Sequence, residues 1–219
     1  MVGVSKCVVV LSGGPDSVTT AYWAKAQGYD VHAITFSYSQ KAQVEIERAR
    51  LLAAGLGVGH LVVDLSPLRA VYQGVTSLVD EDIEVTSEFT KPIIVPFRNG
   101  VFLSVAVAYA ESIGATHIFY GAHAGDEPFY PDCRREFYKA FEEAARLGTD
   151  HEITIEAPFS DIPKSEVIKK AIELKVPLEQ TWSCYLSGPL HCGRCESCLN
   201  RMRAFREAGV SDPTQYSTK

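Results

Sequence analysis

Five short apolar runs, separated by longer segments of mixed polarity, set the pattern of this chain. The first, at residues 6–11, reads Lys-Cys-Val-Val-Val-Leu and stops one residue before a pair of glycines. An apolar run without alternation is typical of a strand that is buried on both faces of a parallel sheet. Further runs predict strands at residues 30–36, 59–65, 115–121 and 153–157.

The segments between these runs predict helices. Helical spacing of apolar positions places them at residues 18–27, 39–55, 101–113, 136–147 and 164–174. Strands that alternate with helices of this length are joined by right-handed crossovers, which produce a parallel sheet covered by helices on both faces. The sequence therefore predicts an α/β fold, doubly wound around a mostly parallel sheet.

One connection does not fit this alternation. Residues 66–91 have no clear period and include four acidic residues between positions 80 and 84. The segment is too long for a bare connection in a compact domain, so we interpret it as a lid or a partner-contacting loop. A disordered surface loop is the alternative.

The turn after the first strand, at residues 12–17, carries the clearest chemical signal. Its glycines, Gly13 and Gly14, let the backbone adopt conformations closed to other residues and approach a ligand closely. The helix that follows directs unpaired N–H groups and its positive dipole end into the turn, which favours an anion. Ser12 and Ser17 add hydroxyl donors. The turn is predicted to bind phosphate; an ordinary Ser/Gly connection is the alternative.

Two common phosphate-binding motifs are excluded. The turn lacks the lysine of the G-x-x-x-x-G-K-[ST] loop and the spacing of the G-x-G-x-x-G fingerprint. Asp16 suits the first helical turn but would repel phosphate unless Mg²⁺ lies between them. A magnesium-dependent site is therefore expected.

Four cysteines near the C-terminus predict a metal site. Cys184, Cys192, Cys195 and Cys198 can close a tetrahedral shell of four thiolates, which is typical of structural zinc. An iron–sulfur cluster is the alternative, but the C-x₂-C-x₂-C run has Met202 where a ferredoxin-type fourth cysteine would fall.

Length and charge limit the remaining classes. A chain of 219 residues with 46% hydrophobic and 22% charged residues is long enough for one α/β domain with a small appendage. A net charge of −6 argues against a protein that binds nucleic acid through its backbone. We see no signal peptide and no window near the roughly 20 apolar residues of a membrane span. A soluble, cytoplasmic protein without direct nucleic-acid or membrane contact is expected.

Three further positions allow two interpretations each. Arg98 and Asn99, at a helix start, could bind a substrate carboxylate or a purine edge; Arg98 could instead cap a neighbouring helix. Cys133 could be a nucleophile, although a binding or packing role fits better because no histidine is paired with it in the sequence. Lys164 could neutralise departing pyrophosphate or be an ordinary surface lysine.

Taken together, these motifs resemble the 7-cyano-7-deazaguanine synthases, a family of N-type ATP pyrophosphatases. The resemblance covers nearly the whole chain and rests on residues 12–17, 36–40, 96–99, 130–134, 181–185 and the cysteine cluster. One stretch departs from the family: its usual Tyr-Gly-Gln-Arg-His reads Tyr-Ser-Gln-Lys-Ala at residues 38–42.

The resemblance implies an adenine-nucleotide α-hydrolase-like fold and a reaction. ATP would activate 7-carboxy-7-deazaguanine, ammonia would convert it to an amide, and a second activation would give the nitrile. ATP binding is implied for Leu11, Ser12, Gly13, Gly14, Asp16, Ser17, Val18 and Thr19, with Asp16, Ser17 and Lys164 as catalytic residues. The candidates for substrate binding are Arg98, Asn99, Asp126, Tyr130, Asp132 and Arg134.

The expected cofactors are therefore ATP, Mg²⁺ and Zn²⁺, and the partners are the small-molecule substrate and ammonia. We divide the chain into a pyrophosphatase domain at residues 1–180 and a zinc-binding segment at residues 181–219. The apolar helix at residues 101–113 and the loop at residues 66–91 suit a homodimer contact. Two other functions compete: another enzyme of the superfamily, such as one acting on a tRNA base, and a non-enzymatic zinc-binding interaction protein.

Overall fold

The computed structural model describes residues 4–217, which fold around one five-stranded sheet. Its strands are β1 Lys6–Val10, β2 Asp30–Ser37, β3 Gly59–Asp64, β4 His117–Tyr120 and β5 Thr154–Glu156. They lie in the order β3-β2-β1-β4-β5, and every neighbouring pair is parallel. The strand order reverses between β1 and β4, so the doubly wound α/β prediction is confirmed. Ligands bind at such a switch point, at the carboxyl ends of the strands.

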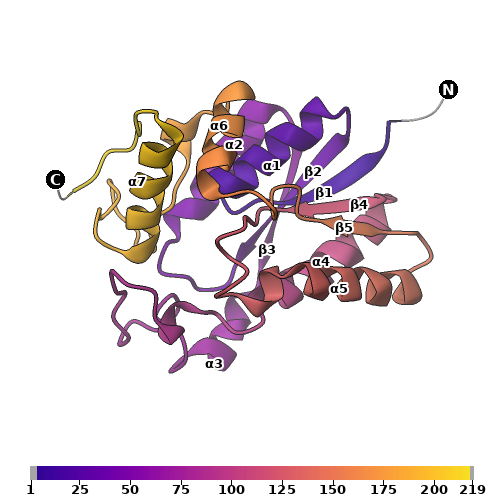
Figure 1. Cartoon of the computed structure of the whole chain (residues 1–219). Helices are drawn as coiled ribbons and strands as arrows, with labels where there is room; N and C mark the ends of the chain where they lie inside the picture. The colour runs from indigo at the N-terminus through magenta and orange to yellow at the C-terminus, as the bar shows by residue number, and fades with distance from the viewer. Residues whose placement is uncertain (1–3, 218–219) are drawn as a thin grey trace.

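Helices cover both faces of the sheet (Figure 1). Helices α1, α2 and α6 lie over one face, and α4 and α5 lie over the other; α7 packs against α6. The helices are α1 Pro15–Ala26, α2 Val44–Leu56, α3 Arg69–Tyr72, α4 Arg98–Ile113, α5 Arg135–Gly148, α6 Lys164–Glu173 and α7 Glu196–Ala208. The sequence pattern did not predict α3 or α7.

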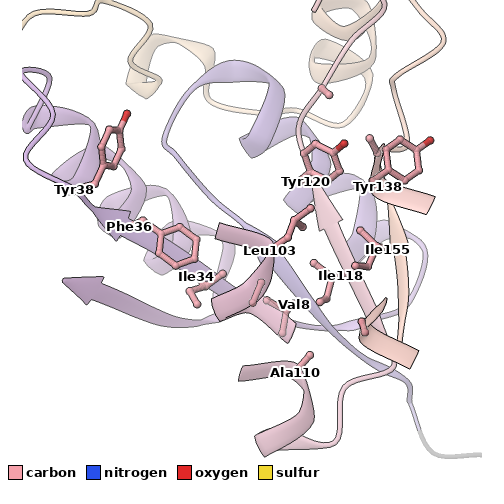
Figure 2. Close-up of a cluster of buried hydrophobic side chains, with 14 of the residues drawn as sticks. Val8, Ile34, Phe36, Tyr38, Leu103, Ala110, Ile118, Tyr120, Tyr138 and Ile155 are labelled. Atoms are coloured by element: carbon pink, nitrogen blue, oxygen red, sulfur yellow. The ribbon is translucent and has the colours of Figure 1, made fainter. Parts of the chain in front are cut away.

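Strand β1 is buried on both faces, as its unbroken apolar run predicts. Val8 packs with Ile34 and Ile118 in the cluster under α4 and α5 (Figure 2), whereas Cys7 and Val9 join the cluster under α1 and α2. Burial raises the pKa of the Cys7 thiol to about 12, which leaves it a neutral core residue. The alternation of β1 side chains therefore ties the two layers of helices together.

The second helix begins later than its sequence predicts. The expected helix at residues 39–55 starts only at Val44. Ser39 has a φ of 64°, and the Gln40 side chain accepts a hydrogen bond from Tyr38 N at 2.8 Å and donates one to Phe36 O at 3.2 Å. These side-chain bonds hold a turn that competes with the first helical turn.

The segment at residues 66–91 is packed against the domain. It contains α3, and Thr76 and Ser77 are fully buried and donate hydrogen bonds to Pro92 O at 2.9 and 3.2 Å. Leu78 reaches the main cavity. The alternative of a disordered surface loop is therefore wrong, and a lid or partner-contacting function stays a prediction.

The stretch that contains α4 is more apolar than expected. Lys91–Ile113 is long and apolar enough to cross a membrane by length and composition alone, so the expectation that no window approaches a span is wrong. Within it, α4 is only 16 residues long and lays Leu103, Ala106 and Ala110 on the sheet. This is the packing of a core helix in an α/β domain.

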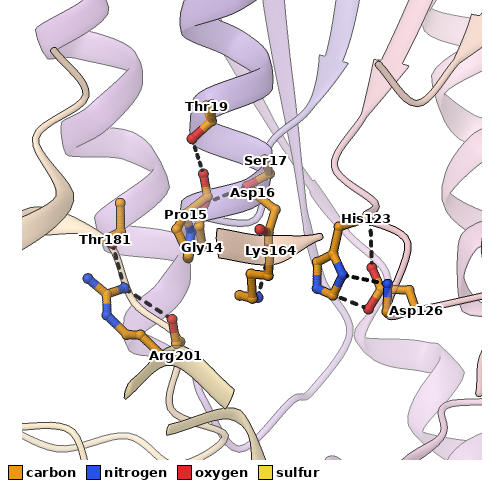
Figure 3. A network of polar contacts seen from close by, with 12 residues as sticks. Gly14, Pro15, Asp16, Ser17, Thr19, His123, Asp126, Lys164, Thr181 and Arg201 are labelled. Atoms are coloured by element: carbon orange, nitrogen blue, oxygen red, sulfur yellow. Dashed lines mark hydrogen bonds and ion pairs between the residues drawn. The ribbon is translucent and has the colours of Figure 1, made fainter. Parts of the chain in front are cut away.

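The C-terminal segment is hydrogen-bonded to the phosphate-binding turn, and its helix α7 packs against α6. Trp182 N donates to Gly13 O at 2.9 Å. Arg201 of α7 is fully buried and donates to Thr181 Oγ1 at 2.8 Å and to Leu178 O at 2.9 Å. Figure 3 shows this guanidinium beside Thr181. The segment therefore completes one wall of the site.

Candidate active site

A cavity of about 240 Å³ opens at the carboxyl ends of β1 and β2. Its floor is the turn after β1, and its walls come from β2, α2, α4, the loop after β4, α6 and the C-terminal segment. Six aromatic side chains line it: Phe36, Tyr38, Phe102, Tyr120, Tyr130 and Tyr185, and Trp182 adds a seventh. The cavity combines phosphate-binding groups at one end with flat apolar walls that suit a heterocycle.

The predicted phosphate loop has the geometry of an anion site. Ser12 Oγ and Ser17 Oγ lie 3.0 Å apart, and Ser17 Oγ is also within 3.1 Å of both Ser12 N and Gly14 O. Pro15 begins α1, as expected. Gly13 has a φ of 85°, and a Cβ atom there would lie 2.6 Å from Glu45 O. Only glycine lets the loop pass this close to α2.

The loop after β4 presses on the start of α1. A Cβ atom at Gly121 would lie 2.6 Å from Ser17 N and 2.8 Å from the carbonyl carbon of Asp16. The backbone just after β4 is thus in direct contact with the first turn of α1. This contact fixes where the N–H groups of that turn point.

Asp16 and Lys164 form an ion pair at the cavity. Lys164 Nζ lies 2.7 Å from Asp16 Oδ2, and the two side chains are only 14% and 20% exposed (Figure 3). Burial raises the pKa of Asp16, but the charge of Lys164 and its hydrogen bond to the carboxylate outweigh burial, so the carboxyl titrates below its usual range. Lys164 is therefore not an ordinary surface lysine.

The other oxygen of Asp16 fits a cation. Asp16 Oδ1 is buried and has no hydrogen-bond partner among the described residues. An unsatisfied carboxylate oxygen beside a phosphate-binding turn is the ligand type that Mg²⁺ uses together with phosphate oxygens. The residues present thus fit a magnesium ion held by Asp16.

His123 and Asp126 extend this polar network (Figure 3). His123 is buried, and its Nδ1 accepts a hydrogen bond from Gly125 N at 3.0 Å. The ring proton therefore lies on Nε2, which faces Asp126 Oδ1 at 3.4 Å. Asp126 Oδ2 accepts the His123 backbone N–H at 3.0 Å. Both oxygens of Asp126 are held, and the residue lines the cavity.

Arg98 and Asn99 stand at the start of α4, on another wall of the cavity. Arg98 Nη1 donates to Tyr38 Oη at 3.1 Å, and within residues 4–217 its side chain donates to no carbonyl of a helix end. Asn99 N donates to Asp132 Oδ2 at 2.8 Å, and Asn99 Nδ2 contacts Cys133 Sγ at 3.2 Å. Burial raises the pKa of the Cys133 thiol, which keeps it protonated and favours packing over nucleophilic attack.

Sequence reasoning missed two side chains at this site, one in the turn after β2 and one on α2. Glu45 and Gln40 line the cavity, and Gln40 Nε2 donates to Glu45 Oε1 at 2.9 Å. Burial raises the pKa of Glu45 to about 7, against the opposing effects of Gln40 and Arg98. Gln40 falls in the stretch at residues 36–40 that carries the family resemblance, whereas Glu45 lies outside it and had no sequence signal.

Of the residues that the sequence suggested for nucleotide and substrate binding, most line the cavity and some do not. Leu11, Ser12, Gly14, Asp16, Ser17, Arg98, Asn99, Asp126, Tyr130 and Lys164 line the cavity. Gly13, Val18, Thr19, Asp132 and Arg134 are not part of that lining among the described residues. Val18 and Thr19 are buried in α1, and Arg134 Nε donates to Glu127 O at 3.3 Å.

The four C-terminal cysteines converge. The Sγ atoms of Cys184, Cys192, Cys195 and Cys198 all lie within 4.8 Å of one another. The separations Cys192–Cys198 and Cys184–Cys195 are 3.9 and 4.0 Å, close to the edge of about 3.8 Å of a tetrahedral ZnS₄ centre. Backbone N–H groups of Leu186 and Cys192 also point at Cys184 Sγ at 3.4 Å. The cluster suits a structural metal.

A comparison with known protein families shows to which family this chain belongs. Residues 6–209 match the family described as "Queuosine biosynthesis protein QueC". The chain belongs to the QueC family. The resemblance expected from the motifs is thereby confirmed.

Relatives of this QueC chain share its length. A Caldicellulosiruptor bescii protein named 7-cyano-7-deazaguanine synthase is 42% identical over 214 residues, covering 96% of this chain and 97% of that protein. A Thermoplasma acidophilum protein of the same name is 45% identical over 222 residues, covering 96% and 92%.

Solved structures show the same fold at low identity. The NMN synthetase of Francisella tularensis aligns with a TM-score of 0.54 and 19% identity, covering 98% of this QueC chain and 80% of that one. A 4-thiouridine synthetase–RNA complex with bound ATP aligns with a TM-score of 0.54 and 18% identity, covering 94% and 50%. These likenesses concern the fold alone.

Proposed function

We propose that this protein is an ATP-dependent 7-cyano-7-deazaguanine synthase, a ligase that forms a carbon–nitrogen bond. It converts 7-carboxy-7-deazaguanine and ammonia to the 7-nitrile. The observation that carries the proposal is one cavity in which a phosphate loop faces an aromatic pocket, in a chain that belongs to the QueC family. The competing functions, an enzyme acting on a tRNA base or a non-enzymatic zinc protein, are not favoured.

The reaction explains why the site needs ATP twice. A carboxylate is a poor acceptor for ammonia because its leaving group would be oxide. Attack of the carboxylate oxygen on the α-phosphorus releases pyrophosphate, and ammonia then displaces AMP to give the amide. Attack of the amide oxygen on a second ATP releases pyrophosphate again, and loss of AMP and of both N–H protons leaves the nitrile.

Charge neutralisation and positioning are the contribution of the protein. The turn formed by Ser12, Gly13, Gly14 and Ser17 binds the pyrophosphate portion of ATP through N–H and hydroxyl donors. The ammonium group of Lys164, 2.7 Å from Asp16, offsets the negative charge that develops on departing pyrophosphate. Asp16 would hold Mg²⁺, which supplies electrophilic stabilisation of the phosphates when bound.

The remaining candidates serve the heterocycle and the scaffold. Arg98 and Tyr130, which both line the cavity, contact the deazaguanine, and Asn99 with Asp132 fixes the start of α4. Leu11, Val18 and Thr19 support the nucleotide-binding turn. The negative charge of Asp126 favours the charged form of Lys164. Arg134 stabilises the loop after β4 through its hydrogen bond to Glu127 O.

Zinc, domains and partners complete the proposal. Residues 1–180 carry the nucleotide chemistry, and Zn²⁺ on the four cysteines holds residues 181–219 against them. For the homodimer we propose a contact through α4 and the segment at residues 66–91, where Val71 and Val75 are exposed. The charge of −6 supports a small-molecule enzyme of the cytoplasm without a direct nucleic-acid partner.

Product analysis tests the proposal. The protein is incubated with ATP, Mg²⁺, ammonium and 7-carboxy-7-deazaguanine; the product is weighed by mass spectrometry and AMP is quantified. We expect the nitrile and two AMP per nitrile. AMP without nitrile would mean that the acceptor is wrong, and no AMP would refute the enzyme assignment.

A further inference from the structure

One ionisable side chain in the cavity has no role in the chemistry above. Glu45 lies in the first turn of α2 and lines the cavity together with Arg98 and Tyr38. Among the described residues it forms no ion pair within 4.0 Å. A cavity carboxyl without a cationic partner within 4.0 Å is available to bind donors of a ligand.

Gln40 determines how Glu45 is presented. Tyr38 N donates to the Gln40 Oε1 atom, and Gln40 Nε2 donates to Phe36 O. These two backbone groups fix the orientation of the amide, so an N–H group of Gln40 is directed to Glu45 Oε1 at 2.9 Å. Gln40 is 3% exposed, which makes this contact rigid.

The other carboxyls near the cavity are already occupied. Asp16 pairs with Lys164, and both oxygens of Asp126 face His123. Asp132 accepts Asn99 N and is not part of the cavity lining. Glu45 is therefore the carboxyl best placed to recognise the heterocycle.

A carboxylate such as Glu45 distinguishes the deazaguanine from the adenine of ATP by the groups on their ring edges. The ring edge of a deazaguanine offers two neighbouring donors, N1–H and the 2-amino group, next to an acceptor, the 6-oxo group. Adenine instead presents the lone pair of N1 beside its amino group, and a carboxylate would repel it. The Arg98 guanidinium is near enough to Glu45 to oppose the rise of its pKa, and it supplies a donor for the 6-oxo group.

From this arrangement we infer that Glu45 recognises the N1–H and 2-amino edge of the deazaguanine, with Gln40 as its positioning residue. The inference rests on the proposed function. Glu45 therefore decides which heterocycle enters the site, while the turn at residues 12–17 serves ATP.

The test compares two substrates that differ by one group: 7-carboxy-7-deazaguanine and its analogue without the 2-amino group. The ratio of their kcat/KM values for AMP release is measured at saturating ATP and ammonium for the parent chain, Glu45→Gln and Glu45→Ala. Glu47→Gln is the matched control, because Glu47 lies on the same helix with a side chain that is 71% exposed. Thermal unfolding shows that each variant is folded.

We expect the parent and Glu47→Gln to prefer the amino-bearing substrate by about 10- to 100-fold, and the Glu45 variants to lose most of this ratio without a change in the KM for ATP. The KM for the heterocycle should rise. Since the pKa of Glu45 is about 7, binding of the heterocycle to the parent should tighten as the pH rises through 7, and Glu45→Gln should abolish that dependence. Arg98 stays charged and Tyr38 neutral across this range, because their pKa values are raised.

Two results would overturn the inference. If the Glu45 variants keep the substrate ratio, or if they raise the KM for ATP or ammonium instead, Glu45 does not recognise the heterocycle. If the parent chain releases no AMP with 7-carboxy-7-deazaguanine, the proposed function fails first and this inference fails with it. The parent reaction distinguishes the two failures.

Discussion

Gly121 is the position where the structure makes its sharpest mechanical prediction. It directly follows β4 and lies against the first turn of α1, and no positive φ accompanies the contact, so the effect of an added methyl group is purely steric. In Gly121→Ala the new Cβ would lie 2.6 Å from Ser17 N and 2.8 Å from Ser17 Cα, both backbone atoms. A flexible side chain cannot move aside to relieve this overlap.

The size of the effect follows from the distance. An ordinary contact begins at 3.4 Å, so β4 and α1 must separate by about 0.8 Å. Overpacking of this kind costs about 1–3 kcal/mol of unfolding free energy, and in a chain of this size each kcal/mol lowers Tm by about 2–4 °C. A displacement near 1 Å of a group that positions substrate can reduce the rate by about 10²-fold. We therefore expect kcat/KM for AMP release to fall by about 10²-fold.

The control is Gly148→Ala at the end of α5, where an added Cβ meets nothing within 4 Å. This variant should keep full activity and gain up to about 1 kcal/mol of stability. AMP release and urea unfolding are measured for both variants. A Gly121→Ala variant with activity within threefold of the parent would show that the contact between β4 and α1 does not position the phosphate loop.

Three further predictions concern the ion pair, the buried arginine and the cysteines. Lys164→Met should lower kcat for AMP release by about 10²–10³-fold, because the site loses the positive charge beside pyrophosphate. The control Lys169→Met, on the exposed side of α6, should leave kcat unchanged. Equal effects of the two variants would contradict the role of Lys164. Arg201→Leu should cost about 3–5 kcal/mol in urea unfolding, because it removes the buried guanidinium that pairs with Asp212 and donates to Thr181 Oγ1 and Leu178 O. A loss below about 1 kcal/mol would refute that account. Cys198→Ser should reduce bound zinc, measured by plasma mass spectrometry, from one per chain to near zero and expose residues 181–217 to protease, whereas full zinc content would remove Cys198 from the ligand set.

Local sequence was sufficient wherever neighbouring residues make the structure. The turn at residues 12–17 could be predicted because an apolar strand, two glycines and a proline at the helix start follow one another directly. The cysteine cluster could be predicted because Cys192, Cys195 and Cys198 are close in sequence. The strand pattern likewise predicted the parallel sheet. Each of these features depends on spacing along the chain, and the family resemblance added the substrate.

Tertiary structure decided which distant residues share the cavity. Helix α2 begins late because Gln40 bonds to the backbone of β2, and this brings Glu45 to the site. The pairing of Lys164 with Asp16 joins α6 to α1 across more than a hundred residues. Gly121 and Arg201 matter only through atoms that folding places beside them. Their burial and partners come from packing between elements, which the periodicity of a single element does not encode.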